Sequence, residues 1–403
     1  MEWKEVKIGD LGQIITGKTP KTAIKKNWGG KIPFLSPSDD MSNKTSPVTA
    51  RTLTELGVAE VAKCLIPANS ICVSCIGSDL GKVVKTDREL VTNQQINTIV
   101  PHSNVDSDFV YYLMCIVGKE LNYISKTSTA VPIINKSTFS DWNIVIPEKV
   151  EDQRRIASIL SSLDRKIELN NKINADLEEM AQAIFKNWFV DFEPFKDGKF
   201  VDSELGMIPE GWKVGTLGDF CKCLLGGTPS RSKEEYWNGD VNWINSGEIN
   251  KFRILEASEK ITELGLSKSA TKLLPKKTTV LAITGATLGQ VSLLEIDTCA
   301  NQSVIGVLEN TEIPYEYIYP FIKDRIEMLI QHQTGGAQQH INKDNVESLI
   351  FLLPAKNVLE GYISLVRPMY KRIESQCFEN LYLSLLRDTL LPRLMSGEIE
   401  VPE

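Results

Sequence analysis

The stretch VEDQRRIASILSSLDRKIELNNKINADLEEMAQAIFKNWFV at residues 150–190 decides the architecture of this chain. It contains neither Pro nor Gly, and its apolar residues recur at alternating steps of four and three. These residues are Ile156, Leu160, Leu163, Ile167, Leu177, Ala181, Ile184 and Trp188. Such steps are typical of a coiled-coil seam, so the stretch predicts a helical rod of roughly 55 Å.

A second stretch, from about residue 358 to residue 391, repeats this pattern. Its apolar stripe consists of Leu359, Tyr362, Val366, Met369, Ile373, Leu383 and Leu390. Pro368 lies inside the stretch and predicts a kink, whereas Pro392 follows its predicted end.

Both stripes are interrupted by polar residues at mid-length. They are Asn170 and Asn174 in the first stripe, and Gln376 and Asn380 in the second. If the two helices pack antiparallel, their midpoints meet. We therefore predict that these polar layers face each other and fix the register of the helix pair.

The two helical stretches belong to an internal repeat. Nine of the 28 positions from Trp3 to Gly30 are identical 209 residues later, where average composition gives roughly two. Asn93-Gln94 recurs 208 residues later, and Ile134-Asn135-Lys136 recurs 207 residues later. The drift is small, so the chain is expected to be a duplicated module with pseudo-twofold symmetry.

Each copy begins with about 150 residues rich in Gly, Thr, Ser and Asn, with short β-rich runs such as SICVSCIG and TTVLAITG. We expect an α+β (mixed α/β) fold in which two similar globular domains, built largely on antiparallel strands, are separated by two long helices packed as an antiparallel coiled coil. The expected boundaries are a globular domain at 1–149, a helix at 150–192, a linker and second globular domain at 193–356, and a helix with a tail at 357–403.

Composition excludes several classes of protein. The net charge of −7 argues against a globally basic nucleic-acid binder but leaves a locally basic one possible. The longest apolar runs are far short of the ~20 residues that cross a bilayer, and the first ten residues lack the apolar part of a secretory signal. We expect a cytoplasmic protein with no membrane partner and with eight free cysteine thiols.

One loop of the first domain is strongly basic. Five lysines fall within 14 residues that contain no acid, namely Lys18, Lys21, Lys25, Lys26 and Lys31. Clustered lysines beside hydroxyl and amide side chains suit contacts to nucleic-acid phosphates. The alternative is an ordinary solvated loop.

The organisation resembles the specificity (S) subunit of type I restriction-modification systems over essentially the whole chain. The stretches that carry the resemblance are PEKVEDQRRIASILSSLDRKIELNNKI at 147–173, AIFKNWFVDFEPF at 183–195, SELGMIPEGWKVGTLGD at 203–219 and LLPRLMSGEIEV at 390–401. The resemblance implies that each globular domain is a target-recognition domain that reads one half of a bipartite, asymmetric DNA site. It also implies that the helices set the spacing between the half-sites.

The resemblance further implies a non-catalytic chain. Its implied partners are double-stranded DNA, two methyltransferase (modification) subunits and restriction subunits. S-adenosylmethionine is then expected on the methyltransferase subunit, and ATP with Mg on the restriction subunit, so no cofactor is expected in this chain.

One family feature differs between the two copies. Family domains often end with a Gly-rich stretch followed by Gln, as in GGAQQHINK at 335–343, which makes Gln338, Gln339 and Lys343 candidates for DNA contact. The first copy has Val131 and Pro132 in place of this polar pair.

The remaining candidates for base reading are loop residues at matched places in the two copies. They are Thr19, Ser36, Ser38, Asp39, Asn93, Gln94 and Gln95 in the first copy, and Thr228, Ser230, Arg231, Asn245, Glu248, Asn301 and Gln302 in the second. Asn and Gln can bond adenine bidentately, and carboxylates can accept from cytosine. For Asn93 and Asn301 the alternative is that they cap turns.

An aromatic cluster near the end of the first helix, Phe185, Trp188, Phe189, Phe192 and Phe195, has two interpretations. It either docks the methyltransferase subunit or packs between helix and domain. Of these residues, we take Phe185, Trp188, Phe189 and Phe192 as the docking candidates.

Two motifs suggest other chemistry. GQIITGKT at 12–19 satisfies the P-loop pattern, and a nucleotide hydrolase using Gly17, Lys18 and Thr19 is one alternative function. However, its arch is β-prone and no amphipathic helix follows. Cys72 and Cys75 form a C-x-x-C, but the chain has only three His and we expect no metal site. A second alternative function is a scaffold with two protein-binding domains.

Overall fold

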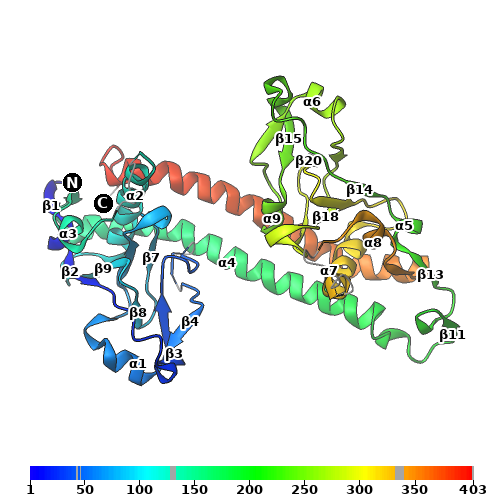
Figure 1. The fold of residues 1–403 in the computed structure, drawn as a ribbon, viewed down its shortest axis with the longest axis horizontal. Coiled ribbons are helices and arrows are strands. Elements are labelled where there is room, and N and C mark those ends of the chain that lie inside the picture. Colours follow the sequence, from blue (N-terminus) through cyan, green and yellow to red (C-terminus); the bar gives the residue numbers. More distant parts are fainter. Residues whose placement is uncertain (42–43, 46, 128–132, 332–339, 402–403) are drawn as a thin grey trace. The chain divides into compact units, whose positions relative to one another are not determined.

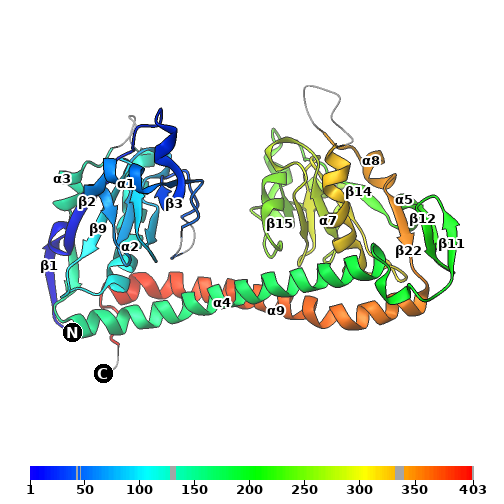
Figure 2. The same cartoon turned by 90° about the horizontal axis from the view of Figure 1, so that it is seen from below.

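A computed structural model describes residues 1–41, 44–45, 47–127, 133–331 and 340–401. The chain divides into two compact units, which we call unit 1 (Met1–Glu168 with Leu381–Glu403) and unit 2 (Leu169–Asn380). Each unit contains one globular domain and a stretch of each of two long helices, α4 (Val150–Phe189) and α9 (Lys356–Met395) (Figures 1 and 2).

The domain of unit 1 contains two four-stranded sheets and a two-stranded sheet. The strand order of the first is β2 (Gly12–Thr16), β9 (Ile96–Pro101), β6 (Ile71–Ser74), β7 (Val83–Lys85), and that of the second is β4 (Arg51–Leu53), β3 (Trp28–Leu35), β8 (Leu90–Thr92), β5 (Leu65–Ile66). The pair is β1 (Trp3–Lys7) with β10 (Asn143–Pro147). Among these strands only β3 and β8 pair in parallel, so the expectation of largely antiparallel sheets is confirmed.

Helices α1 (Glu55–Glu60), α2 (Ser107–Thr127) and α3 (Lys136–Ser140) complete this domain. Helix α2 packs on β6 and β7. Its apolar face shares one core with Ile156 and Leu160 of α4 and with Leu391 and Leu394 of α9. The core therefore continues from the sheet, through α2, into the helix pair.

Unit 2 repeats this plan element by element. The strand order of its first four-stranded sheet is β14 (Cys223–Leu225), β21 (Val304–Val307), β18 (Thr279–Ala282), β19 (Val291–Leu293). That of the second is β16 (Glu259–Ile261), β15 (Trp237–Ile244), β20 (Thr298–Ala300), β17 (Leu273–Leu274). The pair is β13 (Lys213–Thr216) with β22 (Ile350–Leu353), and the helices are α5 (Leu217–Phe220), α6 (Glu263–Ser267), α7 (Tyr315–Gln331) and α8 (Lys343–Glu347). A hairpin, β11 (Phe200–Ser203) with β12 (Gly206–Pro209), is added before it. The predicted duplication is confirmed.

The ends of the two long helices differ slightly from the prediction. Helix α9 continues without interruption through Pro368, whose neighbours Val366 and Tyr370 are buried in the core of unit 2. It also runs past Pro392 to Met395, so the prediction that Pro392 follows the helix is wrong. The last turn is held because Leu394 and Met395 are buried in the core of unit 1.

The polar residues at mid-length meet within unit 2. Asn170 donates a hydrogen bond from Nδ2 to Oδ1 of Asn380 over 2.8 Å, and Gln376 donates from Nε2 to Oδ1 of Asn170 over 3.0 Å. Asn174 donates to Sγ of Cys377. Further along the same two helices, Phe189 packs on Tyr362. Residue numbers rise along α4 as they fall along α9, so the helices are antiparallel.

The same arrangement holds within unit 1, where Arg387 of α9 pairs with Asp164 of α4 over 2.8 Å. Among the described residues the structure has no helix with the length and hydrophobicity that a bilayer crossing requires.

Candidate nucleic-acid interface

A threonine and a glutamine meet at the same exposed place in both domains. In unit 1, Thr19 donates a hydrogen bond from Oγ1 to Oε1 of Gln94 over 2.8 Å. In unit 2, Thr228 donates from Oγ1 to Oε1 of Gln302 over 2.6 Å. We call each of these pairs a Thr–Gln pair. Each contact joins residues about 75 positions apart in the chain, so the repeated sheet positions it.

The backbone beneath each Thr–Gln pair leaves no room for a side chain. A Cβ added to Gly17 would lie 2.2 Å from the carbonyl oxygen of Asn93, and one added to Gly226 would lie 2.1 Å from that of Asn301. The next residue in each loop then bonds the neighbouring strand, through Lys18 N to Thr92 O in unit 1. The glycine in each G-x-T-P loop is therefore required by close backbone approach.

The asparagines beside these glutamines serve the fold. Oδ1 of Asn93 accepts from the backbone N–H of Gln95, and Oδ1 of Asn301 accepts from that of Ser303, each over 3.0 Å. The Asn93 amide also donates to the side chain of Gln95. The turn-capping alternative therefore describes the side-chain oxygens of Asn93 and Asn301, and these contacts favour it over base reading.

Two predicted base-reading carboxylates are also used internally. Asp39 is buried and accepts from the backbone N–H groups of Ser36 and Ala50 over 2.7 and 2.8 Å. Glu248 is buried and accepts from the hydroxyl of Ser258 over 2.7 Å. These contacts correct the prediction, since each carboxylate satisfies loop donors that would otherwise be unpaired.

The hydroxyl and amide neighbours of these carboxylates behave similarly. The Ser36 hydroxyl is bonded to Asp39 and lies 3.0 Å from that of Ser38, and the Asn245 side chain accepts from the N–H of Gly247 over 2.8 Å. Ser36 is buried, so its base-reading prediction is also wrong, whereas Ser38 is exposed.

The five lysines of the basic loop in the first domain are accessible. Lys18, Lys21, Lys25, Lys26 and Lys31 are all exposed, and Lys25 and Lys26 lie in the short 3-10 helix η2 (Lys25–Asn27). Ser230, Thr228 and Gln302 are exposed in unit 2. Lys343 begins α8 and pairs with Glu347 over 3.1 Å. Gln338 and Gln339 lie outside the described residues, as do Val131 and Pro132.

Arg231 stacks on an aromatic pair that the sequence analysis did not single out. Its guanidinium lies 3.6 Å from the ring centre of Trp237 and pairs with Glu259, whose pKa it holds below the usual range through their hydrogen bond. In unit 1 the equivalent Trp28 carries Arg51 from β4, at 4.7 Å. Each domain thus places an arginine on the equivalent tryptophan, although the two arginines come from different elements.

A buried ion-pair network joins the domain of unit 2 to its helices. Glu178 of α4 accepts from Arg253 and from Tyr319, each over 2.8 Å, and Lys277 pairs with Glu374 of α9 over 3.0 Å. Burial alone would raise the pKa of Glu178, but the charges of Arg253 and Lys323 outweigh it and the pKa lies below its usual range.

Unit 1 has a corresponding network around Lys44, which is matched to Arg253 by the 209-residue repeat. Lys44 pairs with Asp108 and donates to Ser161 of α4, over 2.8 and 2.7 Å. Burial alone would raise the pKa of Asp108, but Lys44 and Lys85 hold it below its usual range. Neither network was predictable from the sequence, because the partners lie far apart in the chain. The one feature of the sequence that indicated a shared network was the basic residue at both matched positions, Lys44 and Arg253.

The aromatic cluster packs inside unit 2. Phe185 is 2% and Phe189 is 5% exposed, and both contact Tyr317 and Tyr362. Their burial corrects the docking interpretation for these two residues, because a buried ring offers no surface to another subunit. Trp188 and Phe192 are half-buried against the same core, where Trp188 packs on Tyr362 and Phe192 on Trp212.

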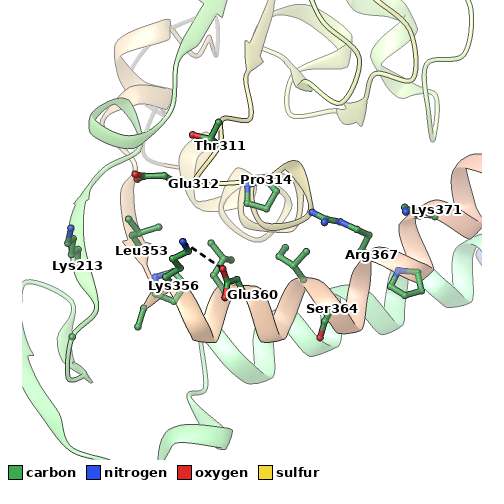
Figure 3. Close-up of a pocket in the computed structure, with 16 residues that line it drawn as sticks. Lys213, Thr311, Glu312, Pro314, Leu353, Lys356, Glu360, Ser364, Arg367 and Lys371 are labelled. Atoms are coloured by element: carbon green, nitrogen blue, oxygen red, sulfur yellow. Dashed lines mark ion pairs between the residues drawn. The ribbon is translucent and has the colours of Figure 1, made fainter.

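A groove of about 920 Å³ lies beside α9 in unit 2 (Figure 3). Its apolar lining is Pro314, Leu353, Leu359 and Ile363, and its charged rim includes Lys213, Glu312, Lys356, Glu360 and Lys371. A smaller groove of about 300 Å³ in unit 1 is lined by Lys4, Asn104, Ile146 and Gln153, which the repeat matches to Lys213, Glu312, Leu353 and Glu360. The two grooves therefore occupy equivalent places in the two units.

The other chemical motifs have structural explanations. The P-loop-like stretch begins as strand β2, which ends at Thr16 and leads into an irregular segment that includes Pro20 rather than directly into a helix. All eight cysteines are free thiols, as expected. Burial raises the pKa of the Cys72 thiol to about 12. Within the described ranges, no group of His, Cys, Asp and Glu side chains has the geometry of a metal site.

Comparison with known proteins gives consistent matches over the whole chain. The family described as type I restriction modification DNA specificity domain matches residues 1–179 and 209–358. The chain is 30% identical to the type I restriction enzyme MjaIX specificity subunit of Methanocaldococcus jannaschii, over 100% of this chain and 94% of that protein. It is 25% identical to the HindI specificity subunit of Haemophilus influenzae, over 99% of this chain and 100% of that one.

Among solved structures, the fold is similar to that of the type I restriction-modification S subunit from M. genitalium. The TM-score is 0.58 at 16% identity, with 100% of this chain and 97% of the other covered. This similarity concerns the fold alone, and it includes the two domains and the long helices.

Proposed function

Because the chain belongs to the type I restriction-modification DNA specificity family, whose members are non-catalytic, we propose that each of its two domains reads one half of a bipartite DNA site. The observation that carries this proposal is the Thr–Gln pair, which recurs at the same exposed place in both domains. A duplicated pair suits a duplicated task, which is to contact two half-sites of one duplex.

The chemistry of the pair suits a DNA groove. In each domain the threonine hydroxyl donates to the glutamine Oε1 and restricts the side chain, while the glutamine itself is exposed. A glutamine held in this way presents its amide nitrogen as a donor at a defined position, and it loses little side-chain entropy on binding. The glycine-backed loops below keep both partners in place.

Residues that differ around the shared pair are the source of different sequence preferences. Lys18 and Gln95 in unit 1 stand where unit 2 has Gly227 and Ser303. Phosphate contacts from the exposed lysines position the duplex, and base contacts from these variable neighbours distinguish the half-sites.

The experiment measures DNA binding by the full chain in complex with its methyltransferase subunits. Gln94→Ala and Gln302→Ala should each weaken binding to the target by about 1–3 kcal/mol. The loss of affinity should be larger for the target than for a mixed-sequence duplex. Gln13→Ala, an exposed glutamine on β2, is the matched control. Unchanged target affinity in both variants would contradict the role of the pair.

We also propose that methyltransferase subunits dock at the two equivalent grooves, one beside α9 in unit 2 (Figure 3) and the other in unit 1. Two grooves at matched positions suit two copies of one partner. The apolar floor is surrounded by Lys213, Lys356, Arg367 and Lys371 against Glu312 and Glu360, so the groove is complementary to an amphipathic helix with an excess of acidic residues. The restriction subunits would then join the complex that this docking forms.

Docking is tested by filling the groove of unit 2. Ser364→Trp places a large ring in the groove, whereas Leu365→Trp changes an exposed neighbour outside the groove lining. We expect Ser364→Trp to lower the methyltransferase content of the purified complex from two copies to one, and Leu365→Trp to leave two. Two copies bound to the Ser364→Trp variant would contradict this docking site.

In this account the chemistry belongs to the partners. S-adenosylmethionine binds the methyltransferase subunits, and ATP with Mg binds the restriction subunits, while this chain supplies recognition. We propose that the complex acts on double-stranded DNA in the cytoplasm.

A further inference from the structure

The basic loop of unit 1 has a structural twin of different charge in unit 2. The 3-10 helix η2 (Lys25–Asn27) of unit 1 corresponds to η6 (Glu234–Tyr236) of unit 2. The residues before these two helices have φ/ψ of −90°/90° and −106°/95°, and the residues after them have −117°/158° and −116°/165°. The backbone therefore enters and leaves the short helix in nearly the same conformation in both copies.

The same hydrogen bond closes both loops. Trp28 Nε1 donates to the carbonyl of Lys21 over 3.5 Å, and Trp237 Nε1 donates to the carbonyl of Ser230 over 3.2 Å. Because the loops share backbone and anchor, side chains at matched positions are presented in the same way. The two loops therefore differ in the residue types at matched positions rather than in how the backbone presents them.

The charges at the matched positions are opposite. Lys25 and Lys26 in unit 1 correspond to Glu234 and Glu235 in unit 2. Residues 17–31 contain five lysines and no acid, whereas residues 226–240 contain Arg231 and Lys233 against Glu234, Glu235 and Asp240. One loop carries a net charge of +5 and its twin a net charge of −1.

The pairing of these charges also differs. In the part of the chain that the structure describes, no ion pair involves any of the five lysines, all of which are exposed. By contrast, Arg231 is bound to Glu259 and lies on Trp237. Unpaired cations grouped in one loop repel each other, and a polyanion relieves that repulsion.

We propose that the two domains hold DNA unequally: the loop at residues 18–31 anchors the phosphate backbone, and its twin at residues 227–240 repels it. This proposal rests on the proposed function and adds that the two domains contribute differently to DNA affinity. The domain of unit 1 supplies most of the salt-dependent affinity, and the domain of unit 2 relies on contacts that depend little on charge.

Matched charge reversals test the proposal in the full complex with methyltransferase subunits. Lys25→Glu with Lys26→Glu should weaken binding to a mixed-sequence duplex on the order of tenfold. The slope of log K against log salt should become shallower, by about 2 or more in magnitude. Glu234→Lys with Glu235→Lys should do the opposite, with tighter binding and a steeper slope. All four side chains are exposed, so thermal melting should not change.

The outcomes separate this inference from the proposed function. If the unaltered complex binds no DNA, the proposed function fails. If it binds DNA but the lysine reversal leaves both affinity and slope unchanged, the anchoring role is overturned. If only the glutamate reversal has no effect, the repulsion by the loop of unit 2 is overturned. Phosphate ethylation interference gives an independent check, since it should be stronger over one half-site than over the other.

Discussion

Asn170 of α4 and Asn380 of α9 are joined by a hydrogen bond of 2.8 Å, although 210 residues separate them in the chain. Asn170 is completely buried and also accepts from Gln376. The hydrogen bonds between these amides form in only one register of two antiparallel helices, so we propose that the layer specifies how the helices align.

This layer predicts opposite effects of single and double substitutions. Asn170→Leu leaves the buried amide of Gln376 without its partner and should lower the free energy of unfolding by about 1–3 kcal/mol. Adding Gln376→Leu should recover most of that loss, because two packed apolar side chains replace two polar ones. Urea unfolding followed by circular dichroism measures both. A single variant as stable as the unaltered chain would show that the layer contributes nothing.

The network around Glu178 predicts that unit 2 is sensitive to acid. Glu178→Gln removes the closer of the two carboxylates that pair with the buried guanidinium of Arg253, the other being Glu295, and should cost about 3 kcal/mol at pH 7. For a unit of this size the melting temperature should fall by roughly 6–12 °C. Glu179→Gln, at the exposed neighbouring position, is the control and should change little.

The sign of the pH dependence follows from the lowered pKa of Glu178. A carboxyl with a lowered pKa in the folded state stabilises the protein above its unfolded pKa, about 4.3 for Glu, and this contribution is lost as pH falls through the folded value. The difference in stability between the unaltered chain and Glu178→Gln should therefore shrink below about pH 4. A difference that stays constant down to pH 3 would contradict the ion-pair account.

The buried cysteines should be chemically inert. The pKa of Cys72 is raised to about 12 by burial, so almost no thiolate is present at pH 8. Iodoacetamide at that pH should leave Cys72 and Cys299 unmodified in the folded chain, and should modify all eight cysteines after denaturation. Peptide mass spectrometry gives the answer, and rapid labelling of Cys72 in the folded state would show that its environment is open.

The P-loop alternative predicts nucleotide binding that depends on Lys18. We expect none, because the stretch runs from strand β2 into an irregular segment at residues 17–21, whereas a P-loop lysine lies at the start of a helix. Titration calorimetry with ATP and Mg²⁺ on the isolated chain should show no heat of binding. Binding that disappears in Lys18→Ala would restore the alternative function.

The domain organisation of the chain was predictable, because the long helices follow from the periodicity of apolar residues and the two similar domains follow from the internal repeat. The steps of four and three predicted α4 between Val150 and Phe189, and the repeat predicted two domains with the same strand order. The position of Pro392 misled the prediction of the second helix end, since a proline near a helix end says little about burial of the residues around it.

The candidate site was less predictable, because polar residues in loops serve two purposes. Asp39 and Glu248 have the right type and position for base reading, but each satisfies backbone or hydroxyl donors of its own loop. Sequence alone does not show which donors a loop leaves unpaired. The Thr–Gln pairs were named residue by residue, yet their contacts needed the sheet to bring positions 19 and 94 together.

The central claim is that this chain directs methylation to a bipartite DNA sequence. The most direct measurement is methylome sequencing of host DNA with and without the gene for this chain, accompanied by affinity purification of the chain from the same cells. We predict a two-part methylated motif that disappears with the gene, and a methyltransferase subunit that co-purifies. A methylome that is unchanged by the deletion, with no methyltransferase bound to the chain, would contradict the account.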